Sequence, residues 1–202
     1  MEPILIDVPT ELKTKRLRLR IPSAGEGAIV SAAVRSSLPE LQPYMPWATD
    51  TYNESDGEMW CRRVLARFIL REQITYSIYE VDQFIGGLGP HKIDWKIRSC
   101  EIGYWLRTDR AGHGFMTEAL IAVTDMLGSI GLRRIEVRCD ERNHRSAAVA
   151  RRAGFHHDGT LPATTLDPNR LPRNEMVFSR IHDVPVEETP VSKADVEPVK
   201  SA

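Results

Sequence analysis

Hydrophobic and polar residues along this chain follow two periods, one of two residues and one of about 3.6 residues. The stretch Arg16–Ile21 alternates polar and apolar side chains, which predicts a half-buried strand. Between Phe115 and Gly128 the apolar residues recur every three or four positions, which predicts an amphipathic helix. The same reasoning predicts further helices over 24–36, 54–72 and 143–153, and further strands over 74–80, 84–94, 98–107, 134–140, 155–160 and 175–181.

The order of these elements indicates the fold class. The three strands over 74–80, 84–94 and 98–107 are joined by short turns and should form an antiparallel meander. The segment 37–47, SLPELQPYMPW, holds three prolines and two aromatic residues, so it should be a shaped loop or a broken helix. We expect an α+β fold with a mixed, mostly antiparallel central sheet flanked by helices.

Length and charge narrow the class of protein. The chain has 202 residues, which fits one domain and a short additional segment. Lys and Arg number 27 and Asp and Glu 28, and the net charge of −1 disfavours a dedicated nucleic-acid binder. No run of apolar residues is close to the length of about 18 residues that a membrane-spanning helix needs. The N-terminal stretch also lacks the pattern of a signal peptide. We therefore expect a cytoplasmic protein with neither a nucleic-acid nor a membrane partner.

The cysteines and histidines do not form a metal-binding pattern. Cys61, Cys100 and Cys139 are far apart and odd in number, so we expect reduced thiols rather than a disulfide framework. His156 and His157 are neighbours on a predicted strand and should point to opposite faces. We assign no metal site.

The C-terminal segment 183–202 differs from the rest of the chain. It holds five acidic residues, two lysines, three prolines and no aromatic residue. Such a segment cannot bury enough apolar surface to offset the entropy of ordering it, which predicts a disordered acidic tail. Its net charge of −3 leaves residues 1–182 at +2, and we expect that part to be the folded domain.

A glycine-containing turn stands between a predicted strand and a predicted helix. The stretch 101–120 reads EIGYWLRTDRAGHGFMTEAL, with Gly112 and Gly114 just before the helix. Helix N-termini present unpaired N–H groups and bind phosphates, and glycines let a pyrophosphate approach the backbone. The turn matches neither the Walker A motif nor the Rossmann fingerprint. A plain strand-to-helix turn is the alternative interpretation.

A second informative stretch, 138–155, reads RCDERNHRSAAVARRAGF. Asn143 stands where an N-cap is expected, Ser146 follows in the first turn, and Gly154 ends the helix. A capped helix packed on the sheet accounts for this pattern without any functional role.

Together the two stretches resemble the GNAT superfamily of acyl-CoA-dependent N-acyltransferases. TKRLRLRIP, SLPELQPYMPW, the Gly86-Gly87 strand, EIGYWL and NHRS…AGF resemble its Rim-type branch of ribosomal-protein N-terminal acetyltransferases, over roughly residues 10 to 180. The resemblance implies a GNAT-like sheet, acetyl-CoA as co-substrate and a homodimer. It also implies that the strand before the turn pairs with pantetheine and that residues 112–117 hold the pyrophosphate. The cofactor-binding residues implied are Trp105, Leu106, Arg107, Gly112, His113, Gly114, Phe115, Met116, Thr117 and Asn143.

Three positions depart from the superfamily pattern. Ala111 replaces Gln or Arg, and Met116 stands where a small residue is usual, so its side chain should crowd the phosphate. Ala150 occupies the position where many members carry a general-acid Tyr, and the Rim-type branch implies Ser146 in that role. These departures leave open a catalytically silent CoA-binding sensor.

Acetyl transfer to an amine needs a group that accepts a proton. Strand alternation puts Glu101 and Trp105 on one face, and partial desolvation there should raise the pKa of Glu101. The resemblance supports Glu101 as base or base relay, and a surface acid is the alternative. It also implies an oxyanion donor near the Leu106 N–H, with Ser146 stabilising the departing thiolate.

The part of the site that binds the acceptor is the part that the residue pattern predicts least well. Tyr44 and Trp47, in the proline-rich segment, are candidates to line it, and core packing is the alternative. We expect acetyl transfer in a ternary complex to a primary amine, such as a protein N-terminal α-amine. A small-molecule amine, namely a polyamine, an amino sugar or an antibiotic, is the alternative.

Overall fold

The computed structural model describes residues 2–167 and 170–183, so the predicted tail over 184–202 lies outside the described residues. The strands are β1 (Glu11–Lys13), β2 (Leu17–Arg20), β3 (Tyr76–Glu80), β4 (Gln83–Asp94), β5 (Ser99–Leu106), β6 (Arg134–Asp140), β7 (His156–Leu166) and β8 (Pro172–Ile181). The helices are α1 (Gly27–Arg35), α2 (Leu38–Leu41), α3 (Glu54–Ile69), α4 (Phe115–Ser129) and α5 (His144–Arg152), with short 3-10 turns over Pro3–Leu5 and Thr108–Arg110.

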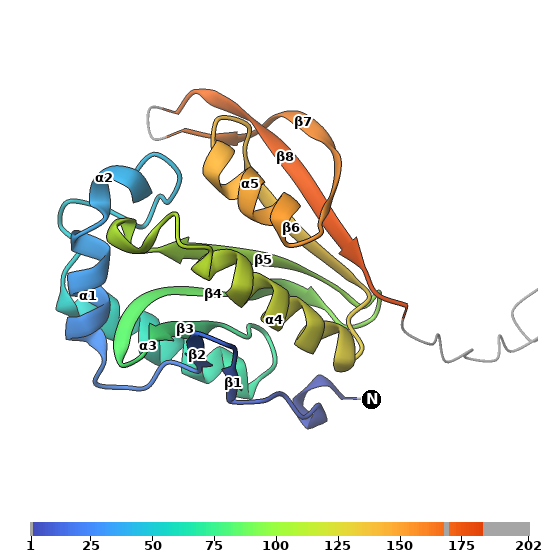
Figure 1. Ribbon diagram of the computed structural model, residues 1–202, viewed down its shortest axis with the longest axis horizontal. Helices are drawn as coiled ribbons and strands as arrows, with labels where there is room; N and C mark the ends of the chain where they lie inside the picture. Colours follow the sequence, from blue (N-terminus) through green and yellow to red (C-terminus); the bar gives the residue numbers. More distant parts are fainter. Residues whose placement is uncertain (1, 168–169, 184–202) are drawn as a thin grey trace, which may run out of the picture.

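The eight strands form one sheet in the order β1-β2-β3-β4-β5-β6-β8-β7. All neighbouring pairs are antiparallel except β5 and β6, which confirms the mixed, mostly antiparallel sheet. The parallel pairing of β5 with β6 covers Ser99–Glu101 against Arg134–Glu136 and no more. Beyond these residues the sheet splays into an N-terminal arm, β1–β5, and a C-terminal arm, β6–β8 (Figure 1).

Two apolar clusters cover opposite faces of the N-terminal arm, because successive strand residues point to opposite faces. Ile78 lies in the larger cluster, the main core, which includes the buried faces of α4 and α5. The adjacent Tyr79 lies in the smaller second core, which α1 and α3 complete. The main core includes Leu19, Ile78, Leu88, Ile102, Met116, Leu120, Val137 and Ala147, and the second core includes Val30, Val34, Cys61, Tyr79 and Phe84.

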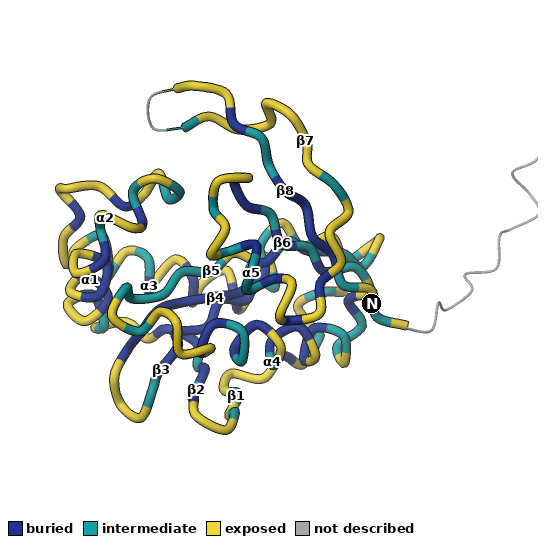
Figure 2. Tube along the Cα trace, turned by 45° about the horizontal axis from the view of Figure 1, so that its top comes forward, coloured by how far each residue is buried: buried dark blue, intermediate teal, exposed yellow. Residues whose placement is uncertain are grey.

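The predicted elements are confirmed except at the two edges of the sheet. The antiparallel meander β3-β4-β5 and the helices α1, α3, α4 and α5 lie where the patterns place them. The three-residue strand Glu11–Lys13 was not predicted, and β7 extends to Leu166 although the pattern ends it at residue 160. The physical reason is exposure: β7 is solvent-exposed along nearly its whole length, so no apolar alternation marks it (Figure 2).

Candidate functional site

The splay between β5 and β6 leaves one edge of β5 without a neighbouring strand. The Arg107 N–H donates to the Ile85 carbonyl on β4 at 2.7 Å. Because alternate amides of a strand point to opposite edges, the N–H groups of Tyr104 and Leu106 face the open cleft. This places the predicted Leu106 donor at the cleft. An extended ligand with amide groups could therefore pair with this edge.

The glycine turn stands at the end of the same edge and leads into α4. Gly112 has φ +85° and Gly114, the residue before the helix, has φ +80°, a region that L-residues with a side chain rarely adopt. A Cβ at Gly112 would meet no atom within 4 Å, so the turn is open on its outer side. The first N–H groups of α4 have no partner within the helix and are presented there. The turn therefore suits an anionic group.

The side chains of the predicted cradle do not fill it. Phe115 and Met116 are 6% and 5% exposed and belong to the main core. The expectation that Met116 crowds the phosphate position is therefore wrong, because the first turn of α4 directs that side chain into the core. Thr117 Oγ1 lies 3.5 Å from Arg152 Nε at the end of α5, and the exposed His113 ring stacks loosely against Phe115. The cradle is thus a backbone feature, with Arg152 as the nearby cation.

A bracing residue that the patterns did not reveal holds the turn. Arg16, just before β2, donates from Nη1 to the His113 carbonyl at 2.9 Å and from Nε to Glu118 Oε2 at 2.7 Å. Thr14 Oγ1 also donates to Glu118, at 2.6 Å. The guanidinium of Arg16 packs over the Phe115 ring. Since Arg16 and Glu118 are 102 residues apart, no local period indicates their contact.

Helix α5 supplies the opposite wall of the cleft. The Asn143 side chain accepts from the Ser146 N–H at 3.1 Å, so the predicted N-cap is confirmed. Ser146 Oγ lies 3.0 Å from the Tyr104 hydroxyl, which in turn donates to the Ser146 carbonyl at 3.1 Å. Burial raises the pKa of Tyr104, and the hydrogen bond with Ser146 offsets only part of this effect. Tyr104 therefore remains a neutral hydroxyl at physiological pH.

Sequence reasoning did not single out Tyr104, although strand alternation contained the signal. Ile102, Tyr104 and Leu106 share one face of β5 and pack with the main core, as the alternation predicts. Helix α5 covers that face at the cleft. A tyrosine on a covered strand face needs a hydrogen-bond partner, and Ser146 is the partner that the fold provides.

The Glu101 carboxylate lies beside a histidine and two basic side chains. Its carboxylate oxygens are 3.3 Å from His91 Nε2 and 2.8 Å from Lys92 Nζ, with Arg138 Nε at 3.8 Å. Burial acts to raise the pKa of Glu101, but the hydrogen bonds from His91 and Lys92 outweigh burial and lower the pKa to about 2. The expected rise of this pKa is therefore wrong. Glu101 is a permanent anion above pH 4 rather than a group poised near neutrality.

The remaining predicted residues lie on the outer side of β5. The rings of Trp47 and Trp105 meet edge to face with centroids 5.9 Å apart, and Trp105 packs against the second core. Trp105 therefore directs its ring away from the cleft, and by the same alternation its N–H faces β4 rather than the open edge. Arg107 directs its side chain to Asp109, at 2.7 Å, and its N–H to Ile85, so neither group faces the open edge of β5.

A polar bridge joins the two arms at the mouth of the cleft. Asp140, at the end of β6, pairs with the buried Arg173 of β8 at 3.1 Å. Arg173 also donates to the Pro43 carbonyl in the loop after α2. In the same loop the Tyr44 hydroxyl lies 3.5 Å from the Arg142 carbonyl. The proline-rich loop is thereby tied to the C-terminal arm, and Trp47 of the same segment packs against Trp105 of β5.

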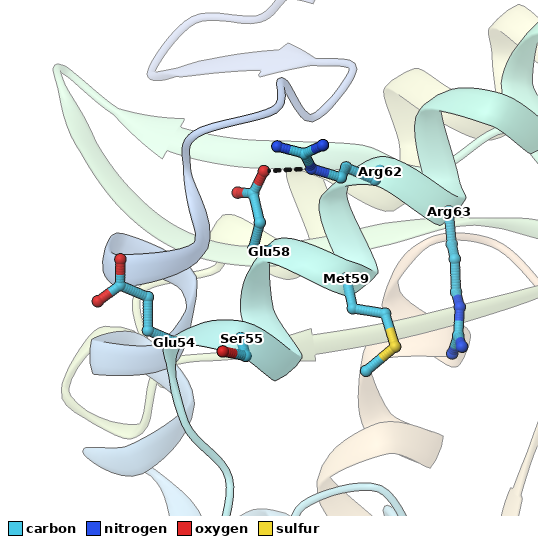
Figure 3. Close-up of a pocket in the computed structure, with 6 residues that line it drawn as sticks. All are labelled: Glu54, Ser55, Glu58, Met59, Arg62 and Arg63. Carbon is cyan, nitrogen blue, oxygen red and sulfur yellow. Dashed lines mark hydrogen bonds and ion pairs between the residues drawn. The ribbon is translucent and has the colours of Figure 1, made fainter.

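A shallow hollow on the outer face of α3 is separate from this cleft (Figure 3). Two of its charged groups already have partners: Glu58 pairs with Arg62 at 2.6 Å and accepts from the N–H groups of Gly25 and Gly27. These contacts hold the start of α1 against α3. The lining residues are Glu54, Ser55, Glu58, Met59, Arg62 and Arg63, and none of them was predicted as functional.

The fold is shared with known proteins. Residues 16–156 match a family model described as "Acetyltransferase (GNAT) domain". A ribosomal-protein-serine acetyltransferase of Escherichia coli (strain K12) is 30% identical over 126 residues, which cover 60% of this chain and 68% of that protein.

Two solved structures share the architecture. The microcin C7 self-immunity acetyltransferase MccE in complex with acetyl-CoA and AMP matches with a TM-score of 0.81 at 21% identity, over 86% of this chain and 97% of that one. RimL, a ribosomal alpha-N-protein acetyltransferase in complex with coenzyme A, matches with a TM-score of 0.80 at 22% identity, over 87% of this chain and 98% of that one. At these identities the likeness shows the fold.

Proposed function

Because the chain belongs to the GNAT acetyltransferase family, we propose that it transfers the acetyl group of acetyl-CoA to a protein N-terminal α-amine in a ternary complex. One observation carries this proposal. The splay of β5 from β6 opens a cleft with an unpaired strand edge, a glycine turn at the start of α4 and a capped helix on the far side.

The residues in the cleft fit acetyl-CoA. The amides of residues 112–117 would hold the pyrophosphate, because a helix N-terminus favours anions and Gly112 leaves the approach open. The free edge of β5 would pair with the amides of pantetheine. Arg152 lies at the same end of the cleft and adds a cation. The thioester would then lie between β5 and α5, where Leu106 and Ser146 are found.

The same geometry assigns roles in the chemistry. The Leu106 N–H would stabilise the oxyanion that forms when the amine attacks the thioester carbonyl. Ser146 would donate a hydrogen bond to the departing thiolate. Glu101, as a permanent anion, would attract the acceptor ammonium and pass its proton on through water.

The acceptor class rests on the mouth of the cleft and on the relatives. Tyr44 and Trp47 would line the entrance, and the loop that carries them is tied in place by Arg173. The Escherichia coli relative is named for a ribosomal protein, which supports a polypeptide terminus as acceptor. A small-molecule amine or a silent CoA-binding role, suggested by Ala111 and Ala150, would be the other outcomes.

An acceptor panel tests the proposal. The protein is incubated with acetyl-CoA and, in turn, peptides with free N-termini, N-blocked peptides containing lysine, polyamines and amino sugars. We expect thiol release with the free N-termini, and mass spectrometry should locate the acetyl group on the α-nitrogen. Release with small amines alone would contradict the acceptor class. Acetyl-CoA binding without release on any amine would contradict the enzymatic role.

The pH dependence of turnover tests the role of Glu101. Since the pKa of Glu101 is about 2, its carboxylate stays ionised above pH 5. Its titration therefore cannot produce the rising limb in a plot of kcat/KM against pH. The limb should follow the acceptor amine, whose pKa is about 8. kcat/KM should therefore rise about tenfold per pH unit and level off near that value. Glu101→Gln should lower kcat/KM about tenfold at every pH and leave the limb in place.

Glu136→Gln is the matched control. Glu136 is the residue opposite Glu101 in the β5–β6 pairing and is likewise held by ion pairs, to Arg134 and Arg138. It should keep kcat/KM within about twofold. A limb that vanishes or moves in Glu101→Gln would show that Glu101 titrates in this range, and our assignment would be wrong.

We also propose that residues 1–182 are the catalytic unit, in a homodimeric cytoplasmic protein. No described helix is long and apolar enough to cross a membrane. Light scattering of the purified chain would measure the oligomeric state, and a 1–182 truncation should retain kcat within about twofold.

A further inference from the structure

Tyr104 and Ser146 reach each other across the cleft from different arms of the molecule. Tyr104 stands on β5 and Ser146 on α5, and their hydroxyl oxygens are 3.0 Å apart. The Tyr104 hydroxyl is also 3.1 Å from the Ser146 carbonyl oxygen. Two acceptor oxygens of one residue therefore lie within reach of a single O–H group. We propose that Tyr104 is a positioning residue that orients and polarises Ser146 in acetyl transfer, an inference that rests on the proposed function.

The hydroxyls of Tyr104 and Ser146 can adopt two hydrogen-bonding arrangements. In the structure Ser146 donates to Tyr104 and Tyr104 donates to the Ser146 carbonyl, so the Ser146 hydroxyl is held in one orientation. A negative charge in the cleft would attract the Ser146 O–H. The Tyr104 O–H can then turn from the carbonyl to Ser146 Oγ without movement of either backbone. The resulting chain, from Tyr104 through Ser146 to the charge, strengthens each of its hydrogen bonds.

Breakage of the thioester C–S bond does not require Tyr104 to lose its proton. When the C–S bond breaks, its electron pair passes to sulfur and the acetyl carbonyl re-forms. The Ser146 O–H donates to the thiolate, and the Tyr104 O–H donates to Ser146 Oγ. Because burial raises the pKa of Tyr104, its proton stays on the phenol throughout. The thiolate later takes its proton from solvent.

The Cys139 thiol also lies within hydrogen-bonding reach of the Ser146 hydroxyl, but burial raises its pKa, and a neutral thiol is only a weak donor and acceptor. Ala150, one turn after Ser146 on α5, is buried and carries only a methyl group. Asn143 uses its side-chain oxygen on the Ser146 N–H, which fixes the helix start rather than the hydroxyl. Tyr104 is therefore the strongest of the hydrogen-bond partners that orient the Ser146 hydroxyl.

The test is a cycle of Tyr104→Phe, Ser146→Ala and the double variant, measured on the full chain with acetyl-CoA and the best peptide acceptor. Tyr104→Phe should lower kcat about tenfold, as expected for loss of a hydrogen bond to a group that develops charge, and should change the KM for acetyl-CoA less than twofold. In the Ser146→Ala background the same change should alter kcat less than twofold. The rising limb of kcat/KM against pH should lie at the same pH in all of these variants as in the wild-type protein.

Tyr76→Phe is the matched control. Tyr76 is fully buried in the main core and stands on β3, with β4 between it and Tyr104. Its hydroxyl donates to the Pro9 carbonyl at 2.6 Å rather than to a group of the cleft. It should retain kcat within about twofold. An equal loss in Tyr76→Phe, or a tenfold loss that persists in the Ser146→Ala background, would overturn the proposal. A pH limb displaced in Tyr104→Phe would overturn it too, because Tyr104 would then titrate.

Two readouts separate this proposal from the proposed function. A wild-type protein that acetylates no amine would contradict the proposed function. If the wild-type protein turns over normally but the effects of Tyr104→Phe and Ser146→Ala on kcat are additive, only the proposed role of Tyr104 is contradicted, and the proposed function stands. Thermal unfolding of the same four proteins checks the contact without any substrate, since non-additive shifts of the unfolding midpoint are expected for two hydroxyls that pair.

Discussion

Gly114→Ala is expected to weaken acetyl-CoA binding at least about 30-fold while kcat at saturation changes less than threefold. Gly114 has φ +80° directly before α4, a conformation that costs an L-residue with a side chain about 1–2 kcal/mol. Alanine would pull the backbone toward negative φ and turn the first amides of the helix away from the phosphates. Loss of even one charge-assisted hydrogen bond accounts for an effect of this size. Calorimetric titration with acetyl-CoA measures it.

Gly131→Ala is the control for backbone strain alone. Gly131 has φ +99°, a Cβ there would meet no atom within 4 Å, and it lies beyond the other end of α4. The 15 residues of α4 separate the two glycines by about 22 Å. Both variants should lose similar stability, but only Gly114→Ala should lose affinity. Equal affinities in the two variants would show that the turn does not hold the cofactor.

Local patterns sufficed for the parts of the fold that one element determines by itself. The apolar stripe of α4 predicts a helix over 115–128, and the structure has Phe115–Ser129. The cap at Asn143 and the glycine turn were also predicted, because each depends on residues within one turn of the chain. The far part of β7, beyond residue 160, was not, because an exposed ribbon carries no apolar alternation.

The contacts that complete the site join residues distant in sequence. Tyr104 meets Ser146 across 42 residues, and Arg16 meets Glu118 across 102. Such pairs follow from the strand order and from the splay of β5 and β6, which no periodicity records. The pKa of Glu101 was mispredicted for the same reason. The pattern showed its neighbour on the same strand, but not His91 of the adjacent strand or the Lys92 that follows it.

Asp140→Ala is expected to lower the free energy of unfolding at pH 7 by about 3 kcal/mol, the cost of leaving a buried cation unpaired. Arg173 is 9% exposed, and Asp140 is its ion-pair partner. Burial acts to raise the pKa of Asp140, but hydrogen bonds from Arg142 outweigh it and hold the pKa below its ordinary value. The carboxylate thus contributes at neutral pH, and its contribution is lost only as acid protonates it. Denaturant unfolding measures the loss.

Asp158→Ala is the matched control, because its ion pair with Arg134 is more exposed and should contribute about 1 kcal/mol or less. A second variant, which combines Asp140→Ala with Arg173→Met, distinguishes an effect on amine binding from an effect on stability. An apolar side chain should recover most of the stability, since buried ion pairs are often replaceable by apolar groups. The double variant lacks the hydrogen bond from Arg173 to Pro43, so its KM for the amine should be about fivefold above the wild-type value, with the KM for acetyl-CoA unchanged. An amine KM that returns to the wild-type value in this variant would show that the loop after α2 does not need the bridge to form the acceptor entrance.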